Sequence, residues 1–539
     1  MQPRKKDRGS TETNRDIVAT AIAAVDAAAG AKAGKERNWR FGYTKHLETS
    51  VRLSLESREQ ALQIADAGLE KAHSMFEFVR DGKTMPFAAA MDGETIASSF
   101  DTHLLQGVGV GASNSVLEVP YGMEGKSADR PYYEGKKALE AGAALTGERL
   151  AAQLDTWVER GTIEPSAAEA IKMVSASEEW LDLSDRYFVL LGATSAMGPL
   201  EILLAHGANV IAVDLNRHFI WEKLFKAARN SCGTLIFPVP TGTKGAGKMS
   251  DAELAKIAGS DLLGQTPEIA NWLVDLLPEE EFMVGNYTYL DGALHVQLAL
   301  ACDAIMQRLC RDRDTNTGLA FLCTPTDCLL CPKEAHDAAA AQAPGGSAWM
   351  RAGLFTLDRN VRPAVETKDK NGTLYYVDGQ SSAQGPNYIL AKRLQHWRAI
   401  LAHADGHTVS TNVAPSTATL SVVHNKQFAA AYGCMHMFPP MEVMYQETSL
   451  AVMGALLIHD TCNPDGVARR GAQLKKNKQN PHLLFGEGSF HGGVWRCSFT
   501  IGTIGIPSAV SFYLTEYRLP LVAALAAIPA WGAWLVGAM

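Results

Sequence analysis

The chain lacks an excess of charge of either sign. Of its 539 residues, 50 are Lys or Arg and 58 are Asp or Glu, which leaves a formal net charge of -8. Proteins that bind nucleic acid through its phosphates usually present a strongly basic surface. The composition therefore favours a small-molecule substrate and gives no support to a nucleic-acid partner.

Cysteine is sparse and follows no regular framework. The nine cysteines are an odd number, spread from position 232 to position 497, whereas small secreted domains depend on paired cysteines. Cys323, Cys328 and Cys331 have the spacing of three ligands of an iron–sulfur loop. No further cysteine follows until Cys434. We therefore expect reduced thiols, a cytoplasmic location and no bound metal.

The two termini suggest different roles. At the N-terminus acidic residues precede any apolar run, which is not the order of a secretory signal, and residues 1–40 are interpreted as a flexible leader. The 21 residues 519–539 carry no charge, and as a helix they could cross roughly 30 Å of hydrocarbon. Pro520 and Pro529 fit a buried helix or hairpin equally well. A membrane anchor, which would make the protein membrane-associated, and a packed terminal segment stay open as alternatives.

Helical periodicity dominates the first third of the chain. Apolar residues recur every three or four positions from Thr44 to Arg80 and again after Lys137, which is the spacing of one buried helical face. Pro165 suits the first turn of a further helix. Residues 41–183 are thus predicted to form a mainly helical domain. They carry no recognisable chemistry, so a packing role or assembly into a homo-oligomer is preferred.

An alternation of strands and helices begins after Asp185. Residues 187–191 are a continuous apolar run, typical of a strand covered on both faces, and a glycine turn, a helix and a second strand at 209–214 follow. Further apolar runs lie at 234–239, 281–284 and 319–323. This alternation predicts an α/β fold with a Rossmann-type doubly wound parallel sheet.

The predicted Rossmann domain spans residues 184–435. Some sixty residues, about 328–387, separate its fifth strand from the helix that carries the candidate catalytic residues, and they are interpreted as an insertion. Residues 436–518 are predicted to form a C-terminal region that binds substrate or caps the domain.

The first turn of this unit carries a motif of small residues. Gly192, Ala196 and Gly198 leave room for backbone amides at a helix N-terminus to approach a pyrophosphate. Asp214 ends the second strand 22 residues after Gly192, where a carboxylate accepts hydrogen bonds from a ribose and repels a 2′-phosphate. The motif therefore predicts NAD(H) as the cofactor, although Arg217 nearby keeps NADP(H) open.

Tyr388 and Lys392 form a candidate catalytic pair. Their four-residue spacing places both side chains on one face of a predicted helix. Reduction of a carbonyl needs an acid that protonates the developing alkoxide, and a neighbouring ammonium group lowers the high pKa of a phenol. Tyr388 is predicted to be that acid, and Lys392 the group that lowers its pKa.

Three motifs occur in the order of one enzyme family. The glycine turn with Asp214, the Tyr388-x-x-x-Lys392 helix and the loop from Pro415 to Thr419 together resemble the short-chain dehydrogenases/reductases over about 235 residues. The resemblance implies that Tyr388 is the general acid/base and that Lys392 also binds the nicotinamide ribose. It further implies that the Pro415 loop closes over the nicotinamide. The implied cofactor contacts are Gly192, Thr194, Ser195, Ala196, Met197, Gly198, Asp214, Arg217, Asn286, Lys392, Pro415 and Thr417.

The chain departs from this family at three places. Ala196 stands where the family usually has Gly, and Asn286-Tyr287-Thr288-Tyr289 follows the fourth strand in place of an Asn-Ala-Gly-like sequence. The family's catalytic Ser, which lies about a dozen residues before the Tyr, also has no direct counterpart. The candidates for its role of holding the substrate oxygen are Thr324 and Thr326, preferred by strand position, or Ser381 and Ser382.

These features favour an NAD(H)-dependent oxidoreductase that interconverts a ketone and a secondary alcohol. The substrate would be apolar or lipid-like if the C-terminal segment meets a membrane. One alternative is a noncatalytic scaffold or sensor that binds a dinucleotide. Another is an S-adenosylmethionine-dependent methyltransferase, whose sheet also has a glycine turn followed by an acidic residue, but methyl transfer does not require the helix of Tyr388 and Lys392.

Overall fold

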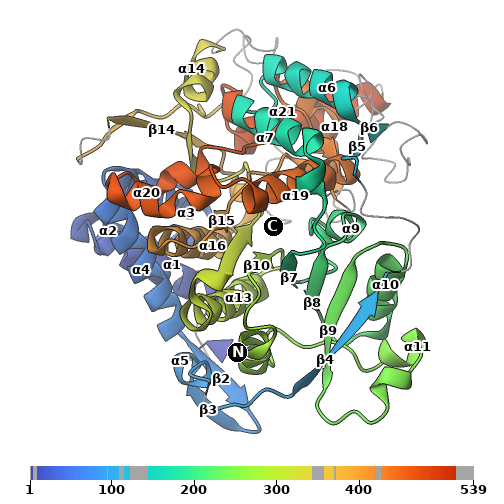
Figure 1. The fold of residues 1–539 in the computed structure, drawn as a ribbon. Coiled ribbons are helices and arrows are strands. Elements are labelled where there is room, and N and C mark those ends of the chain that lie inside the picture. Colours follow the sequence, from blue (N-terminus) through green and yellow to red (C-terminus); the bar gives the residue numbers. More distant parts are fainter. Residues whose placement is uncertain are drawn as a thin grey trace.

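A computed structural model describes most of the chain. It covers residues 2–3, 9–93, 95–107, 115–121, 144–342, 357–368, 372–419, 422 and 426–517. A central sheet runs through the molecule, with helices packed on both sides (Figure 1). The predicted α/β class with a mostly parallel sheet is therefore confirmed.

The central sheet has seven strands in the order β15-β11-β10-β7-β8-β9-β4. From β7 the chain moves outward through β8 to β9, then returns to the other side of β7 and moves outward through β10 and β11 to β15. These six strands are parallel, and β4 at the edge is antiparallel to β9. The strands are β4 (Phe100–Gln106), β7 (Tyr187–Leu191), β8 (Asn209–Val213), β9 (Thr234–Pro240), β10 (Phe282–Asn286), β11 (Thr317–Phe321) and β15 (Val409–Ser410).

Alternate residues of a central strand enter two different cores. In β7, Val189 and Leu191 belong to the core on one face, whereas Phe188 and Leu190 belong to the core on the other. All four side chains are buried. A strand buried on both faces has no position for a solvated polar residue, which explains the continuous apolar run that predicted β7.

Helices on the two faces complete these cores. One face is covered by α12 (Thr266–Asp275), α13 (Ala293–Asp312) and α16 (Pro386–Asp405). The other is covered by α9 (Leu200–Ala205), α10 (His218–Arg229) and α19 (Gln446–Cys462). The connections between successive parallel strands therefore cover the sheet on both sides, as a parallel sheet requires.

Four N-terminal helices pack on the first face beside α16. They are α1 (Ser10–Ala23), α2 (Ala27–Gly34), α3 (Trp39–Leu55) and α4 (Arg58–Ser74). The flexible leader predicted for residues 1–40 is therefore wrong from Ser10 onward. Ile17, Val18 and Ile22 are buried in the same core as the sheet. Alanine fills much of this segment, so its apolar face is a weak periodic signal.

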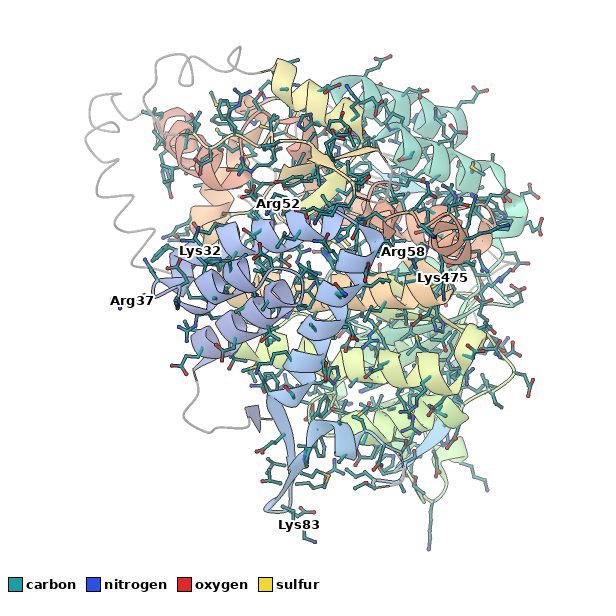
Figure 2. All side chains as sticks on the ribbon, turned by 90° about the vertical axis from the view of Figure 1, so that its left-hand side faces the viewer. Lys32, Arg37, Arg52, Arg58, Lys83 and Lys475 are labelled. Atoms are coloured by element: carbon teal, nitrogen blue, oxygen red, sulfur yellow. The ribbon has the colours of Figure 1, made fainter. Side chains whose placement is uncertain are left out.

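Charged side chains cover the outer surface of these helices. Lys32, Arg37 and Arg52 project from α2, from the turn after it and from α3 on the face shown in Figure 2. All three are exposed, whereas the apolar side chains of α3 point inward. The N-terminal helices are thus amphipathic, with their apolar faces directed to the sheet and α16.

The helices predicted as one domain at residues 41–183 are divided between the two faces of the sheet. On one face, α4 approaches α16 so closely that a Cβ on Gly68 would lie 2.4 Å from the Trp397 ring. On the other face, α6 (Gly147–Arg160), α7 (Pro165–Ala176) and α8 (Glu178–Leu181) pack in the core with α19. Helical periodicity shows that one side of a helix is buried, but not which surface buries it.

Shorter elements complete the fold. The predicted insertion contains an antiparallel sheet in the order β12-β14-β13 and helix α14. The remaining strands and helices are β1 (Gln2–Pro3), β2 (Phe76–Arg80), β3 (Lys83–Pro86), α5 (Phe87–Ala90), β5 (Val119–Pro120), β6 (Ala144–Leu145), α11 (Asp251–Leu254), β12 (Cys328–Cys331), α14 (Lys333–Ala341), β13 (Val365–Glu366), β14 (Thr373–Asp378), β16 (Thr417–Ala418), α18 (Lys426–Gly433), β17 (Met444–Tyr445), α20 (Gly471–Lys476) and α21 (Ile501–Tyr517).

Within the described ranges, no helix combines the length and the apolar character that crossing a membrane requires. The segment 519–539, for which an anchor was one of the two predictions, lies outside the described residues.

Candidate functional site

The glycine turn follows β7 at the carboxyl ends of the parallel strands. Gly192 has a φ of +79°, and a Cβ there would lie 3.0 Å from the Thr288 side chain. A residue with a side chain would be strained in this conformation. The turn therefore lies directly against the segment that follows β10, where the order of the strands reverses.

Asp214 holds the glycine turn in place. Its Oδ2 accepts hydrogen bonds from the Thr194 amide at 2.8 Å and from the Thr194 hydroxyl at 2.7 Å. Its Oδ1 accepts one from the Leu215 amide at 2.8 Å. The predicted position at the end of the second strand is thus correct, but both carboxylate oxygens already have protein partners. Contact with a ribose remains a prediction.

The rest of the turn is bonded to itself and to α19. The Ser195 amide donates to the Gly192 carbonyl at 3.0 Å, and the Gly198 amide donates to the Ser195 carbonyl at 2.9 Å. The Gln446 side chain at the start of α19 donates to the Ala196 carbonyl at 2.8 Å. The helix that follows, α9, begins only at Leu200. The predicted helix after the turn is therefore confirmed, and its N-terminus lies two residues beyond Gly198.

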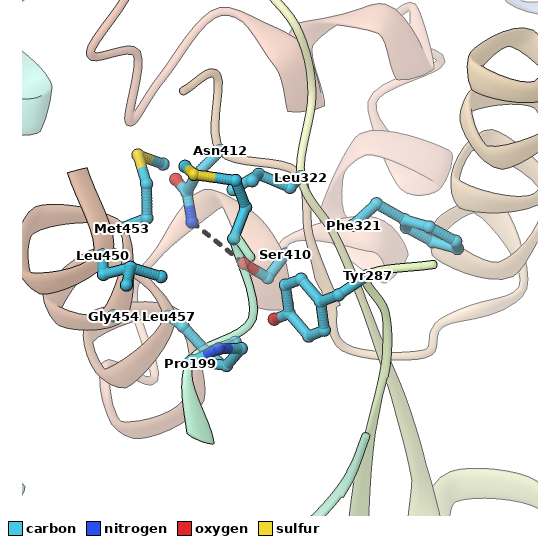
Figure 3. A pocket seen from close by; sticks show the side chains of 11 residues that line it. Pro199, Tyr287, Phe321, Leu322, Ser410, Asn412, Leu450, Met453, Gly454 and Leu457 are labelled. Carbon is cyan, nitrogen blue, oxygen red and sulfur yellow. Dashed lines mark hydrogen bonds between the residues drawn. The ribbon is translucent and has the colours of Figure 1, made fainter. Parts of the chain in front are cut away.

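A narrow pocket lies beneath this turn, between the strand ends and α19 (Figure 3). Leu450 and Met453 line it from α19, opposite Tyr287 and Ser410. The Asn412 side chain donates to the Ser410 hydroxyl at 2.9 Å. The cavity volume is about 10 Å³, which is room for about one water molecule. The other lining residues are Met197, Pro199, Phe321, Leu322, Asn412, Gly454 and Leu457.

A chain of hydroxyl groups reaches Tyr388 from the loop after β11. The Gln384 side chain donates to the Thr326 hydroxyl, which lies 2.8 Å from the Thr324 hydroxyl. Thr324 also accepts from the Thr326 amide at 3.3 Å. The prediction that Lys392 lowers the phenol pKa is not supported, because burial raises the pKa of Tyr388 and a hydrogen bond with the Thr324 side chain, rather than the Lys392 charge, opposes that change. Of the candidates for the family Ser, the structure thus brings Thr324 to the phenol.

The alternative serines serve a different purpose. The Ser381 hydroxyl accepts from the Ala383 amide at 3.3 Å and begins the short 3₁₀ helix Ser382–Gln384. That helix positions Gln384 on the threonine chain. A role for Ser381 or Ser382 in holding the substrate oxygen stays a prediction.

Lys392 binds the end of β11. Its Nζ donates to the Leu322 carbonyl at 2.8 Å and to the Gln395 side chain at 3.4 Å. Burial lowers the pKa of Lys392, and the nearby Cys323 and Asp327 oppose that change. Two donor positions of the ammonium are used, and one remains for another acceptor.

Two aromatic residues that the sequence analysis missed complete the site. The His295 ring in the first turn of α13 stacks on the Tyr388 ring, with centroids 5.8 Å apart and an angle of 16° between the planes. The Tyr289 ring lies 6.3 Å from Tyr388 and 5.1 Å from His295. The only feature of the sequence that could have indicated Tyr289 and His295 is their position shortly after the fourth strand. No local motif identifies them.

Three other residues were predicted to contact the cofactor: Asn286, Thr417 and Arg217. The Asn286 side chain accepts from the Thr288 amide at 3.2 Å and from its hydroxyl at 2.7 Å, so it shapes the loop after β10. The Thr417 hydroxyl donates to the Pro415 carbonyl at 2.9 Å and lies 2.7 Å from the Ser449 hydroxyl of α19. Arg217 is exposed just before α10.

No protein-family model matches the chain, and no curated protein matches it either. In the part of the chain that the structure describes, no three His, Cys, Asp or Glu side chains are arranged to hold a metal ion. The nine cysteines are free thiols. Burial raises the pKa of Cys323, Cys328 and Cys331.

Proposed function

We propose that this protein is an NAD(H)-dependent oxidoreductase that interconverts a ketone and a secondary alcohol. The observation that carries the proposal is the grouping of Tyr388, Thr324 and Lys392 at the carboxyl end of β11. A phenol, a hydroxyl and an ammonium from two segments some sixty residues apart meet there. Such a group can hold a carbonyl oxygen and protonate it.

The strand order supports the dinucleotide part of this proposal. Counted along the chain from β7, the parallel strands lie in the order 3-2-1-4-5-6, which is that of Rossmann dinucleotide-binding domains. In such sheets ligands bind at the carboxyl ends of the strands, where the order reverses. That place is occupied here by the glycine turn and by the segment after β10.

The residues present fit a dinucleotide in their chemistry. The turn at 192–198 presents small residues, Asp214 adds a negative charge beside it, and Lys392 keeps one donor for a ribose hydroxyl. The pocket is smaller than a nicotinamide ring, so Leu450 and Met453 have to withdraw if the ring enters there. An unbranched Met side chain adapts readily.

The chain's own residues then account for the proton transfer. The bound reduced nicotinamide would supply a hydride to the carbonyl carbon. Burial raises the pKa of Tyr388, so the phenol keeps its proton at neutral pH and can transfer it to the carbonyl oxygen only as negative charge develops there. Thr324 accepts two hydrogen bonds from Thr326 if the Thr326 hydroxyl is the donor, which leaves the Thr324 proton for the phenol oxygen or the substrate.

A noncatalytic dinucleotide sensor is the second candidate. The observation in its favour is the closed pocket, together with a glycine turn whose amides of Thr194, Ser195 and Gly198 already donate within the protein. Calorimetric titration with NADH, NADPH and S-adenosylmethionine tests both candidates. Binding of NADH without turnover of any ketone would favour the sensor, and binding of none of the three would contradict both.

Asp214 should make the protein prefer NADH to NADPH. Its carboxylate repels a 2′-phosphate, and a hydrogen bond to a charged group contributes about 1.5–3 kcal/mol, or roughly tenfold and more in affinity. Asp214→Asn should narrow the difference, because it removes the charge but keeps an oxygen that can accept from Thr194. The dissociation constants of both dinucleotides provide the measurement. Equal affinities in the unmodified protein would contradict the prediction.

Thr324→Val should lower kcat about 10²–10³-fold, the usual effect of removing one donor to a developing oxyanion. Valine keeps the shape of threonine but loses the hydroxyl that acts on Tyr388. Thr326→Val is the matched control, because that hydroxyl contacts Thr324 and Gln384 instead. Its effect on kcat should be smaller, and the opposite ranking would show that Thr324 does not hold the reacting oxygen.

A further inference from the structure

His295 is a buried imidazole, and one of its two ring nitrogens has no hydrogen-bond partner among the described residues. It lies in the first turn of α13, which connects β10 to β11, and its exposed fraction is 1%. One ring face stacks on Tyr388. The ring is therefore fixed beside the phenol by two elements that meet at the strand ends.

The position of the His295 proton follows from its neighbours. The Leu290 amide donates to Nδ1 at 3.2 Å, so Nδ1 carries a lone pair and no proton. Burial and the charge of Lys392 lower the pKa of the ring to about 3, so the imidazole is neutral at physiological pH. The single proton of a neutral ring with a bare Nδ1 sits on Nε2.

This Nε2–H group has no acceptor in the described part of the protein. Buried donors are almost always paired with protein, ordered water or ligand. The surroundings of the ring include the Tyr388 phenol, the Tyr289 ring and the Lys392 charge. The donor therefore lies in the one region of the molecule where we place a carbonyl substrate.

We propose that His295 donates a hydrogen bond from Nε2 to the substrate oxygen that Tyr388 protonates. This inference rests on the proposed function and adds a neutral donor to it. As the carbonyl is reduced, negative charge develops on its oxygen, and a donor held in a fixed position stabilises that charge. His295 itself gains and loses no proton. The oxygen would be held by groups from α13, α16 and the loop after β11.

Three variants test the role of the donor. His295→Phe keeps a ring to stack on Tyr388 and removes the N–H, and His295→Gln restores an N–H donor without the ring. His103→Phe is the control, because His103 lies on β4 at the far edge of the sheet. Each is assayed by NADH oxidation with cyclohexanone and with 2-dodecanone, beside Tyr388→Phe.

His295→Phe should lower kcat by about 10²–10³-fold, the effect of removing one oxyanion donor, with little change in KM. The loss should be constant between pH 5 and pH 9, because the ring does not titrate there. His295→Gln should recover part of kcat, and His103→Phe should match the unmodified protein. An equal loss in the Phe and Gln variants would show that the ring only packs on Tyr388. Unchanged kcat in His295→Phe would overturn the inference, while an inactive Tyr388→Phe would leave the proposed function intact.

Nitrogen-15 NMR of the histidine rings gives a readout that does not depend on turnover. We expect the His295 signals of a neutral ring protonated at Nε2, and a shift of the Nε2 proton when cyclohexanone is added to the protein with NADH. A proton on Nδ1, a charged ring at pH 7 or no shift would each overturn the proposal, whether or not the protein turns over either ketone.

Discussion

Tyr388→Phe should abolish ketone reduction while NADH binding stays unchanged. The substitution removes the proton donor and keeps the ring that stacks on His295 and packs against the sheet core. A general acid typically contributes about 10²–10⁴-fold to the rate, so kcat should fall by at least that range. The measurement is the loss of NADH absorbance at 340 nm with a panel of ketones that includes long-chain ones.

The control for this experiment is the affinity for NADH, measured by fluorescence in both proteins. Equal affinity shows that the fold and the dinucleotide site are intact. A lower kcat is then due to the missing phenolic hydroxyl alone. If an active ketone is found and Tyr388→Phe reduces it at the unmodified rate, Tyr388 is not the acid. In that case the proposed mechanism fails even if the dinucleotide binds.

The largest loss of stability is expected for Asp303→Ala. Asp303 in α13 is buried and accepts from Arg398 of α16 at 2.7 and 3.1 Å, and His73 of α4 lies 2.6 Å from it. Removing the carboxylate leaves the buried Arg398 guanidinium without a counter-charge. Breaking one partner of a buried ion pair costs about 3–5 kcal/mol. Urea unfolding should show a correspondingly lower midpoint with an unchanged slope.

A surface ion pair provides the comparison for Asp303. Lys172 and Asp155 are 2.5 Å apart, but their side chains are 29% and 59% exposed. Such pairs contribute about 0–1 kcal/mol because water screens them. Asp155→Ala should therefore leave the midpoint nearly unchanged. A similar loss in both variants would show that the three-helix contact at Asp303 has no special importance.

The same carboxylate should contribute to acid denaturation. Burial raises the pKa of Asp303, but the Arg398 charge and the His73 hydrogen bond outweigh it and bring the pKa from 3.8 to about 2. Because the folded pKa lies below the unfolded one, the unfolded chain takes up the proton first as the pH falls. The contribution of Asp303 to stability is complete above about pH 4 and is lost between pH 4 and pH 2. The difference in stability between the two proteins should shrink over that window.

The structure also explains why the N-terminal helices matter for the site. The Asn14 side chain donates to Asn387 at 2.7 Å, and the Tyr43 hydroxyl donates to the Ser381 carbonyl at 3.1 Å. Asn387 lies in the first turn of α16 next to Tyr388, and Ser381 lies in the loop that leads into this helix. Asn14 belongs to the segment interpreted from sequence as a leader, and it contacts the first turn of the helix that carries the candidate acid. Tight packing of this kind limits the freedom of the side chains around it.

The amino-acid sequence by itself determined the elements that are buried on both faces. The apolar run at 187–191 predicted a strand covered on both faces, and β7 is that strand. The four-residue spacing of Tyr388 and Lys392 predicted that they share one helix, and both lie on α16. These inferences succeed because the burial of a regular element leaves a periodic pattern in its own residues. The position of Asp214 beside the glycine turn followed from the same reasoning.

Only the tertiary structure decided which residues meet. The sequence favoured the threonines over Ser381 by strand position but could not separate Thr324 from Thr326, and the contacts in the structure place Thr324 beside Tyr388 and Thr326 beside Gln384. His295 carries no motif, and its position depends on how α13 packs beside α16. Contacts between residues far apart in the chain depend on how whole helices and strands pack. A local sequence pattern indicates that one face of an element is buried, but it does not indicate which other element covers that face.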